Sequence, residues 1–326
     1  MHILLTGGAG FIGFHTTKAL LARGHTVFAV DEINSYYSVG LKEARLSELG
    51  VEKGWRFAKV DIGDAAALAE AIKGETFDVI IHLAAQAGVR YAVENPAAYT
   101  HSNLVGHQNI LEIARHASRL QHLVYASSSS VYGNDTVAPF SEDARADKPM
   151  SYYGATKRSC ELLSYSYASL YGLKQTGLRF FTVYGPFGRP DMAYWSFTDA
   201  IMRGRPIPVF GQGKLRRDFT YVDDIVDGIV AIAEKPFVVV PGEAPHKVYN
   251  LGNHHPEEVL TLIRIIEQAT GKSANLNFTE GPPGDVNETY ADITRANRDY
   301  GFSPKTPLTE GIPRFVDWFR RYHNYR

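Results

Sequence analysis

The chain has 326 residues, 44% of them hydrophobic, and a formal net charge of -1 at pH 7, which together predict a globular protein with a large core. The near-neutral charge provides no electrostatic footprint for nucleic acid or an anionic membrane, so we expect a small-molecule partner. A single cysteine, Cys160, excludes an intramolecular disulfide and a cysteine-rich metal site, and fits a reducing cytoplasm. None of the 12 histidines pairs at ligand spacing with Asp, Glu or Cys, so no metal site is expected.

The first half of the chain alternates short apolar runs with helical patterns. The opening run, HILLT (2–6), holds three consecutive apolar residues, too few for a secretory signal, and no later segment approaches a membrane span. Helix-length patterns follow at 13–24 and 64–74. Repeated βα units with buried strands predict a parallel sheet covered on both faces. The predicted strands are 2–6, 26–31, 56–61, 79–85, 122–128 and 175–185.

Beyond residue 185, Gly/Pro-rich connections surround fewer regular elements. We expect a Rossmann-like, doubly wound α/β domain over 1–185 and a smaller, mixed α/β substrate lobe over 186–326. The run KVYNLG (247–252) reads as a strand that returns to the main sheet, so 215–252 is expected to rejoin the first domain in part.

A glycine-rich turn, TGGAGFIG (6–13), lies between the first strand and the first helix. Its glycines can be grouped with either Gly7 or Gly8 first, and both groupings leave a bare backbone at a helix amino terminus that receives a pyrophosphate. Asp31 ends the second strand, where a carboxylate binds a ribose diol and disfavours a 2′-phosphate. We therefore expect NAD. The predicted contacts are Gly7, Gly10, Phe11, Ile12, Gly13, Asp31, Asn34, Asp61, Ile62, Leu83, Ala84, Ala85, Asn103 and Lys157.

Hydroxyl groups follow the fifth strand in ASSSSVYG (126–133), and Tyr153 and Lys157 share one helix face about 20 residues later. These residues resemble the short-chain dehydrogenase/reductase superfamily. The resemblance implies that Tyr153 is the general base, that Lys157 holds the nicotinamide ribose, and that Ser128 binds the reacting oxygen. Ser127 and Ser129 remain alternatives, and strand alternation places Ser128 opposite both.

Physical chemistry supports the tyrosine independently. Free tyrosine has a pKa of about 10, and the nearby positive charges of a lysine ammonium and an oxidised nicotinamide favour the phenolate. Tyr153 can then accept a sugar hydroxyl proton as hydride leaves the same carbon, and return it in the reverse step.

Resemblance to the extended branch of this superfamily covers essentially the whole chain. In GQGKLRRDFTYVDD (211–224) it assigns Arg217 to the diphosphate, with Arg216 and Lys214 as competitors. The stretches DEINSYYSVGLKEARL (31–46) and RFFTVYGPFGRPDMA (179–193) are similar to UDP-glucuronate 4-epimerases. That family oxidises carbon 4, turns the 4-keto sugar about its diphosphate linkage, and returns hydride to the opposite face.

The implied substrate is a uronate whose carboxylate needs a cation; Arg90 and Arg189 are the candidate cations, and Thr182 is the hydroxyl partner. Ser129 and Ser130 stand where related UDP-glucuronate decarboxylases and 4,6-dehydratases carry acids, so we rank both activities below epimerisation. Two departures from family patterns are Glu32 beside Asp31, and Pro282 where some neutral-sugar epimerases have a phosphate-binding arginine. The predicted substrate contacts are Arg90, Ser127, Ser128, Ser129, Thr182, Arg189, Gln212, Arg217 and Asp285.

Two alternatives are a UDP-glucose or UDP-N-acetylhexosamine 4-epimerase and a non-catalytic NAD-binding sensor. By family analogy we also expect a homodimer formed by two helices per subunit, near 104–118 and 153–170.

Overall fold

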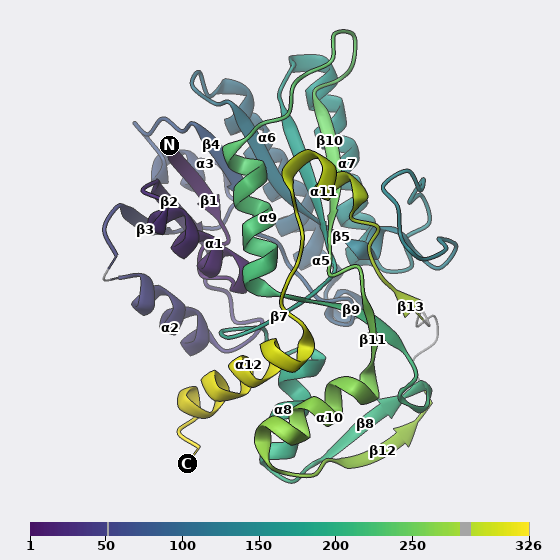
Figure 1. The fold of residues 1–326 in the computed structure, drawn as a ribbon. Helices are drawn as coiled ribbons and strands as arrows, with labels where there is room; N and C mark the ends of the chain where they lie inside the picture. The colour runs from purple at the N-terminus through teal and green to yellow at the C-terminus, as the bar shows by residue number, and fades with distance from the viewer. Residues whose placement is uncertain (51, 281–287, 326) are drawn as a thin grey trace.

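A computed structural model describes residues 1–50, 52–280 and 288–325. Its centre is a seven-stranded sheet in the order β10-β6-β5-β4-β1-β2-β3, in which every pair is parallel (Figure 1). The central strands are buried along their length because helices cover both faces. The strands are His2–Thr6 (β1), Thr26–Asp31 (β2), Trp55–Lys59 (β3), Val79–His82 (β4), His122–Ser128 (β5), Gln175–Phe180 (β6) and His246–Leu251 (β10).

Helices lie on both faces of this sheet. In Figure 1, α1 (Phe11–Ala22) and α9 (Val222–Glu234) pack together on the near face, with α2 (Val39–Leu49) beside α1. The far face carries α3 (Ala65–Ala71), α6 (Gly106–His116) and α7 (Tyr152–Tyr171). The predicted Rossmann-like, doubly wound α/β fold is therefore confirmed.

The remaining elements form a smaller lobe at the carboxyl ends of the strands. In one small sheet, β9 (Arg216–Tyr221) pairs with β7 (Thr182–Tyr184), β11 (Pro256–Glu258) and β13 (Glu288–Thr289). A second pair joins β8 (Pro206–Phe210) to β12 (Asn275–Thr279). The lobe helices are α8 (Ala193–Met202), α10 (Val259–Thr270) and α12 (Leu308–Tyr322), while α11 (Thr294–Tyr300) packs on α9 and β10.

Short helical segments complete the chain. A continuous path runs through α4 (Tyr91–Glu94), α5 (Pro96–Tyr99) and the π-helical η1 (Thr100–Val105) into α6. Two 3-10 turns, η2 (Ser129–Val131) and η3 (Gly211–Gly213), follow β5 and β8.

The structure divides one predicted strand. The run 175–185 separates at Phe181 into β6, which pairs in the main sheet, and β7, which pairs with β9 in the small sheet. The chain therefore passes from one sheet to the other within this run, which periodicity alone did not reveal. Downstream, β10 lies beside β6. The domain limits of 1–185 and 186–326 stay a prediction.

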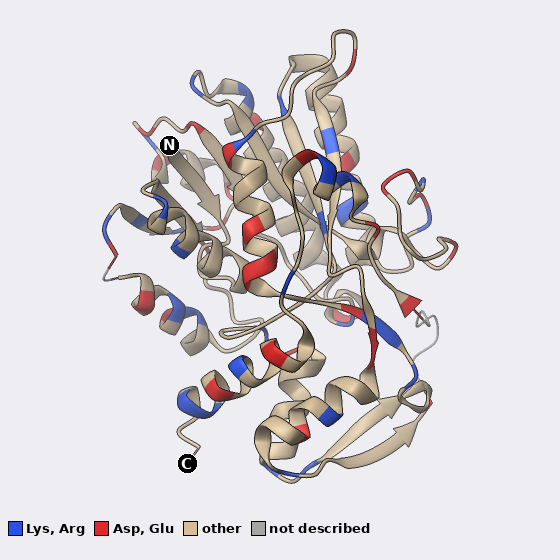
Figure 2. Cartoon of the chain, viewed as in Figure 1, with Lys and Arg blue, Asp and Glu red and all other residues tan. Residues whose placement is uncertain are grey.

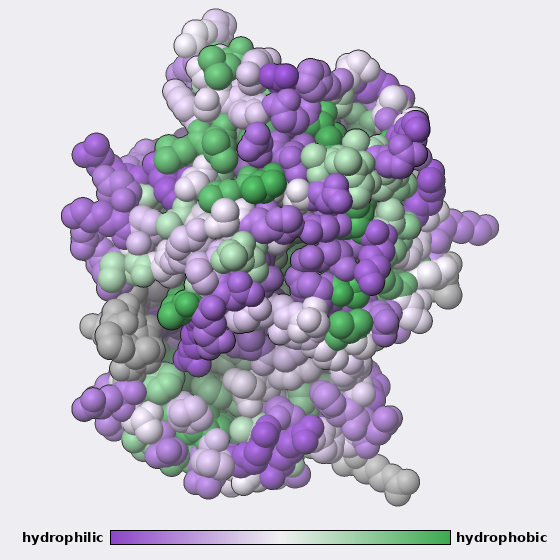
Figure 3. Space-filling model, turned by 180° about the vertical axis from the view of Figure 1, so that it is seen from behind, coloured by the Kyte–Doolittle hydropathy of each residue, from purple (hydrophilic) through white to green (hydrophobic). Residues whose placement is uncertain are grey.

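Charged residues of both signs are distributed over the molecule (Figure 2). The back of the molecule, on the side of α6 and α7, shows separate hydrophobic patches among hydrophilic residues (Figure 3). Among the described residues, no helix combines the length and apolarity needed to cross a membrane. The same part of the chain contains no cluster of His, Cys, Asp and Glu suited to a metal ion.

Candidate active site

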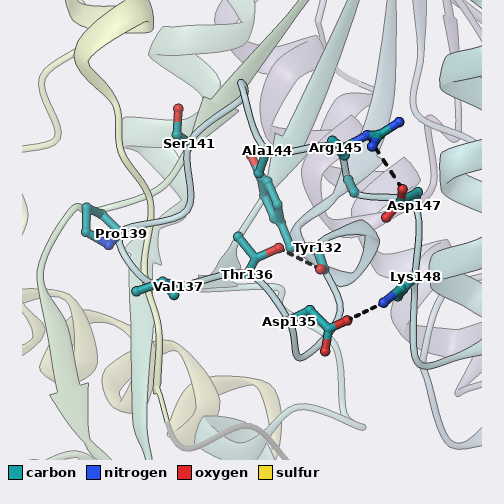
Figure 4. A pocket seen from close by; sticks show the side chains of 11 residues that line it. Tyr132, Asp135, Thr136, Val137, Pro139, Ser141, Ala144, Arg145, Asp147 and Lys148 are labelled. Carbon is teal, nitrogen blue, oxygen red and sulfur yellow. Dashed lines mark hydrogen bonds and ion pairs between the residues drawn. The ribbon is translucent and has the colours of Figure 1, made fainter.

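A cavity of about 1740 Å³ extends along the carboxyl edge of the main sheet and into the smaller lobe. Its lining includes the glycine turn after β1, the ends of β2, β4 and β5, the start of α7, and parts of β7, β8 and β9. This is the crevice where ligands bind in open parallel α/β sheets. A separate cavity of about 340 Å³, which contains the Lys148–Asp135 ion pair, is lined by none of the predicted site residues that the structure describes (Figure 4).

The glycine turn has the bare backbone needed by a dinucleotide. Gly7 has a φ of +78°, a left-handed conformation that favours glycine. A Cβ atom at Gly13 would lie 2.1 Å from the carbonyl oxygen of Gly7, and one at Gly10 would lie 2.9 Å from it. The 12-residue helix α1 begins directly after this turn, so its amino-terminal N–H groups face the cavity edge. The residues present therefore fit NAD.

Asp31 lies at the end of β2, directly beside this turn. Its two carboxylate oxygens accept hydrogen bonds from the backbone N–H groups of Ala9 at 3.1 Å and Ile33 at 2.9 Å. Asn34 follows in the same loop, and its side-chain and backbone oxygens accept from Lys42 Nζ at 2.8 and 2.9 Å. Asp31 and Asn34 thus line the cavity in fixed orientations, with lone pairs of Asp31 remaining for a ribose diol.

The floor of the cavity holds most of the other predicted cofactor residues. Asp61, Ile62, Leu83, Ala84 and Ala85 line it. The carboxylate of Asp61 accepts from the backbone N–H of Gly63 at 2.8 Å and contacts Nε2 of His101 at 2.7 Å.

Asn103 differs from these residues because it is not among those that line the cavity. Its side chain is buried, accepts from the backbone N–H of Gln86 at 2.8 Å, and donates to Gln86 O and Thr156 Oγ1 at 3.1 and 3.0 Å. Asn103 therefore connects the loop after β4 to α7 through hydrogen bonds, without lining the cavity itself.

The first turn of α7 presents Tyr153 and Lys157 to the cavity. Ser151 caps the helix, accepting a hydrogen bond from the backbone N–H of Gly154 at 3.0 Å, which sets the point where the helix begins. Both predicted side chains line the cavity one turn apart. The buried Lys157 ammonium donates to the carbonyl oxygen of Ala126 on β5 at 3.0 Å. Helix α7 is thereby joined to the strand that carries the serines.

The three predicted serines of the run 127–130 have different surroundings. Ser128 Oγ accepts from the backbone N–H of Ser130 at 3.1 Å and so caps the turn η2. Ser127, on the opposite side of the strand, donates to Glu161 at 2.6 Å, and Ser129 begins η2. All three serines line the cavity, but the hydroxyl of Ser127 is already hydrogen-bonded to the buried Glu161.

Glu161 stabilises this part of β5 through a buried ion pair. Its carboxylate receives two hydrogen bonds of 2.8 Å from Arg179 on β6 and a third from Arg158. Burial acts to raise the pKa of Glu161, but hydrogen bonds and charge from Arg179 outweigh it and lower the pKa. Ser127 is therefore positioned by an ionised network behind the cavity wall.

A second pair lies in the loop before α8. Arg189 donates through Nε to Asp191 Oδ1 at 3.1 Å and through Nη2 to Oδ2 at 2.5 Å, while Tyr36 donates to the same Oδ2 at 3.2 Å. Burial acts to lower the pKa of Arg189, but the Asp191 carboxylate raises it, so the guanidinium stays charged. All three residues line the cavity.

The other predicted substrate cations approach from different sides. Arg90 lines the cavity with its guanidinium carbon 5.8 Å from the ring centre of Phe210. Arg217 lines it from β9, whereas the neighbouring Arg216 bonds Glu288 and the carbonyl oxygen of Pro256, and Lys214 is not in the lining.

Thr182 lines the cavity at the start of β7. Gln212 lies in η3 with a φ of +55° and outside the lining, and Asp285 lies outside the described residues.

The fold and this crevice define a nucleotide-binding enzyme of the extended short-chain dehydrogenase/reductase type. The model of the NAD dependent epimerase/dehydratase family matches residues 3–252, and the chain belongs to this family.

The chain is 45% identical to a "Probable UDP-glucuronate 4-epimerase" from Rhizobium meliloti, covering 100% of this chain and 98% of that relative. It is 45% identical to "UDP-glucuronate 4-epimerase 1" from Arabidopsis thaliana, covering 99% of this chain and 77% of that protein. A solved UDP-glucuronic acid 4-epimerase from Bacillus cereus, in complex with UDP-glucuronic acid and NAD, has a TM-score of 0.89 at 34% identity, covering 99% and 100% of the two chains.

Sequence reasoning missed Arg45, which is fully buried on α2. Its guanidinium donates to the carbonyl oxygens of Ala9 at 2.8 Å, Phe187 at 3.0 and 2.6 Å, and Gly188 at 2.9 Å, and to the hydroxyl of Tyr37 at 2.7 Å. Arg45 thus connects the glycine turn to the loop that carries Arg189. In the sequence, Arg45 looks like an ordinary arginine on the surface of a helix, so no local pattern identified its buried role.

Proposed function

We propose that this protein is a UDP-glucuronate 4-epimerase, which interconverts UDP-glucuronic acid and UDP-galacturonic acid through a 4-keto sugar without decarboxylation. The observation that carries the proposal is one cavity lined by the glycine turn, Tyr153, Lys157 and the paired Arg189. Full-length similarity to UDP-glucuronate 4-epimerases supports the same conclusion.

The cofactor residues are the glycine turn and Asp31, with Lys157 at the other end. When bound, NAD would supply a reversible hydride acceptor, so the reaction would need no net oxidant. Pyrophosphate is held by the amino terminus of α1, and the ribose diol by the Asp31 carboxylate. Lys157, fixed by Ala126, holds the second ribose and provides the positive charge beside Tyr153.

The reacting hydroxyl is held by Tyr153 and Ser128. Tyr153 takes the proton from the sugar oxygen and gives it back, while Ser128 donates a hydrogen bond to that oxygen as the carbonyl forms. Ser129 is the alternative donor. Ser127 acts from behind through Glu161 rather than by direct contact.

Substrate selection depends on cations around the remaining cavity. Arg217 binds the diphosphate, and Arg189 with Thr182 binds the uronate carboxylate. Arg90, which lies beside Phe210 in the same lining, is the alternative cation for that carboxylate. In the 4-keto intermediate, the cation stabilises the charge of the bound carboxylate. The carboxylate is therefore retained and decarboxylation is disfavoured. Ser129 and Ser130 place no acid at this point of the lining to assist elimination.

The test is a proton NMR time course of the purified protein with UDP-glucuronic acid and no added cofactor. The anomeric signal of UDP-galacturonic acid is expected, with no pentose product. Tyr153→Phe should abolish turnover and keep NAD bound, whereas Tyr171→Phe, on the exposed end of the same helix, should behave as wild type. Conversion of UDP-glucose but not UDP-glucuronic acid would instead identify a neutral-sugar epimerase.

We further infer a homodimer through α6 and α7, and a cytoplasmic location. The dimer is supported by exposed apolar side chains on α7, among them Leu162, Tyr165 and Leu170. A monomeric mass by light scattering would contradict it. The location is supported by the buried free thiol of Cys160 and by the reliance on NAD.

A further inference from the structure

We propose that Asp191 is the positioning residue for the Arg189 guanidinium and thereby selects sugar nucleotides that carry a carboxylate. This inference rests on the proposed function, because it concerns how the same sugar subsite recognises its anion.

The geometry of the pair leaves one side of the guanidinium available. Asp191 occupies the edge formed by Nε and Nη2, at 3.1 and 2.5 Å. A planar guanidinium has a second edge, formed by Nη1 and the other N–H of Nη2, that can bind a second carboxylate in parallel. Within residues 1–50, 52–280 and 288–325, the Arg189 side chain bonds Asp191 through Nε and Nη2, and the Tyr36 hydroxyl also interacts with the guanidinium. A ligand carboxylate can therefore bind Arg189 without displacing Asp191.

Asp191 is itself held in place by a separate segment. Tyr36, in the loop after β2, donates its hydroxyl to Asp191 Oδ2 at 3.2 Å and packs its ring 4.8 Å from that of Tyr91. Gly88 lies beneath, and a Cβ atom there would be 2.3 Å from the Tyr36 hydroxyl and 3.5 Å from Asp191 Oδ2. Loops after β2 and β4 therefore restrict where Asp191, and hence Arg189, can lie.

Electrostatics give this arrangement its selectivity. The Asp191 charge compensates Arg189 while no ligand is bound, so a neutral sugar gains little from the cation. A ligand carboxylate binds a guanidinium that Asp191 has already oriented. The width of the guanidinium separates the ligand carboxylate from the Asp191 carboxylate. The opposite hypothesis, that Asp191 competes with the ligand for Arg189, predicts the reverse effect of removing Asp191.

The test compares two ligands that differ only at carbon 5. UDP-glucuronic acid carries the carboxylate, and UDP-xylose has the same ring hydroxyls without it. Calorimetry on the NAD-loaded protein should show that Asp191→Ala weakens UDP-glucuronic acid binding about tenfold, the usual scale for a hydrogen bond to a charged group, and changes UDP-xylose binding by less than about threefold. In kinetics, the KM for UDP-glucuronic acid should rise by about the same factor, with kcat changed by less than about threefold.

Four further variants complete the design. Arg189→Ala should lose the same selectivity, and the Asp191→Ala/Arg189→Ala double variant should be no weaker than Arg189→Ala alone, because the two residues act as one unit. Tyr36→Phe should show a smaller loss in the same direction. Asp135→Ala, which removes the Lys148 ion pair of the separate cavity in Figure 4, should match wild type.

Each outcome bears on a different claim. Unchanged or tighter binding of UDP-glucuronic acid by Asp191→Ala overturns the inference and leaves the proposed function intact. Failure of the wild-type protein to prefer UDP-glucuronic acid over UDP-xylose also overturns the inference, whereas the proposed function fails only if the NMR time course shows no conversion of UDP-glucuronic acid. The Asp191 side chain is 30% exposed, so the variant is expected to fold, which a thermal melt would verify.

Discussion

Replacing Arg45 with methionine tests whether the glycine turn and the substrate loop are mechanically joined. Methionine keeps most of the buried volume of the side chain but removes all five N–H donors. The variant leaves the carbonyl oxygens of Ala9, Phe187 and Gly188 and the hydroxyl of Tyr37 without the guanidinium that now binds them. Arg45 has 0% exposure, so water does not reach these groups without local rearrangement.

The expected cost follows from these contacts. A buried acceptor left unpaired costs about 1–3 kcal/mol. The Tyr37 hydroxyl can rotate toward another partner, and the variant no longer bears the desolvation of a buried cation, so the full sum is not expected. We expect a loss of about 3 kcal/mol in the free energy of unfolding, together with release of NAD because the Ala9 carbonyl belongs to the glycine turn.

Urea unfolding and the NAD content of the purified protein measure the two effects. Arg56→Met is the matched control, because this arginine is 68% exposed and pairs with Glu75 at 2.6 Å, a surface contact worth at most about 1 kcal/mol. If Arg45→Met lost less than about 1 kcal/mol and kept its full NAD content, the bonds of this side chain would not carry the role assigned to them.

Other predictions concern the turn, the serine and acid stability. Gly13→Ala should lose NAD, because its Cβ would lie 2.1 Å from a carbonyl oxygen of the same turn; absorbance of the purified protein measures this, and Gly40→Ala, with its nearest contact at 3.7 Å, should retain NAD. Ser128→Ala should lower kcat about 100-fold with little change in NAD content, and near-normal turnover in the NMR assay would assign the oxygen contact elsewhere. Burial lowers the pKa of both His107 and His122 from 6.5 to about 3. These imidazoles bind protons in the unfolded chain before the folded one, so the free energy of unfolding should be highest above pH 6.5 and decrease as the pH is lowered toward 3. Urea midpoints across this range that did not fall would contradict that reasoning.

Sequence patterns predicted those parts of the site that depend on local structure. The turn with Gly7, Gly10 and Gly13 was recognisable because a strand, a tight turn and a helix occur within one short segment. The pairing of Tyr153 with Lys157 followed from helical periodicity, since residues four apart share a face. Both features keep the same geometry wherever the rest of the fold places them.

Tertiary structure decided the features that join distant segments. The sequence favoured Ser128 and left Ser127 and Ser129 as alternatives, and only the structure shows that the hydroxyl of Ser127 bonds Glu161. The neighbours of Arg45 and Asp191 likewise come from separate loops, so their roles have no sequence period.

The sequence by itself thus determined the class of fold, the glycine turn and the helix that carries Tyr153 and Lys157, because short-range backbone geometry and hydrophobic alternation specify each of them. Only the tertiary structure decided that the chain changes sheets at Phe181 and that β10 returns beside β6. It also decided which cations face the cavity and which carboxylates hold them. Such contacts form between residues more than 100 positions apart, as for Arg45 with Phe187, and depend on packing that no local pattern encodes.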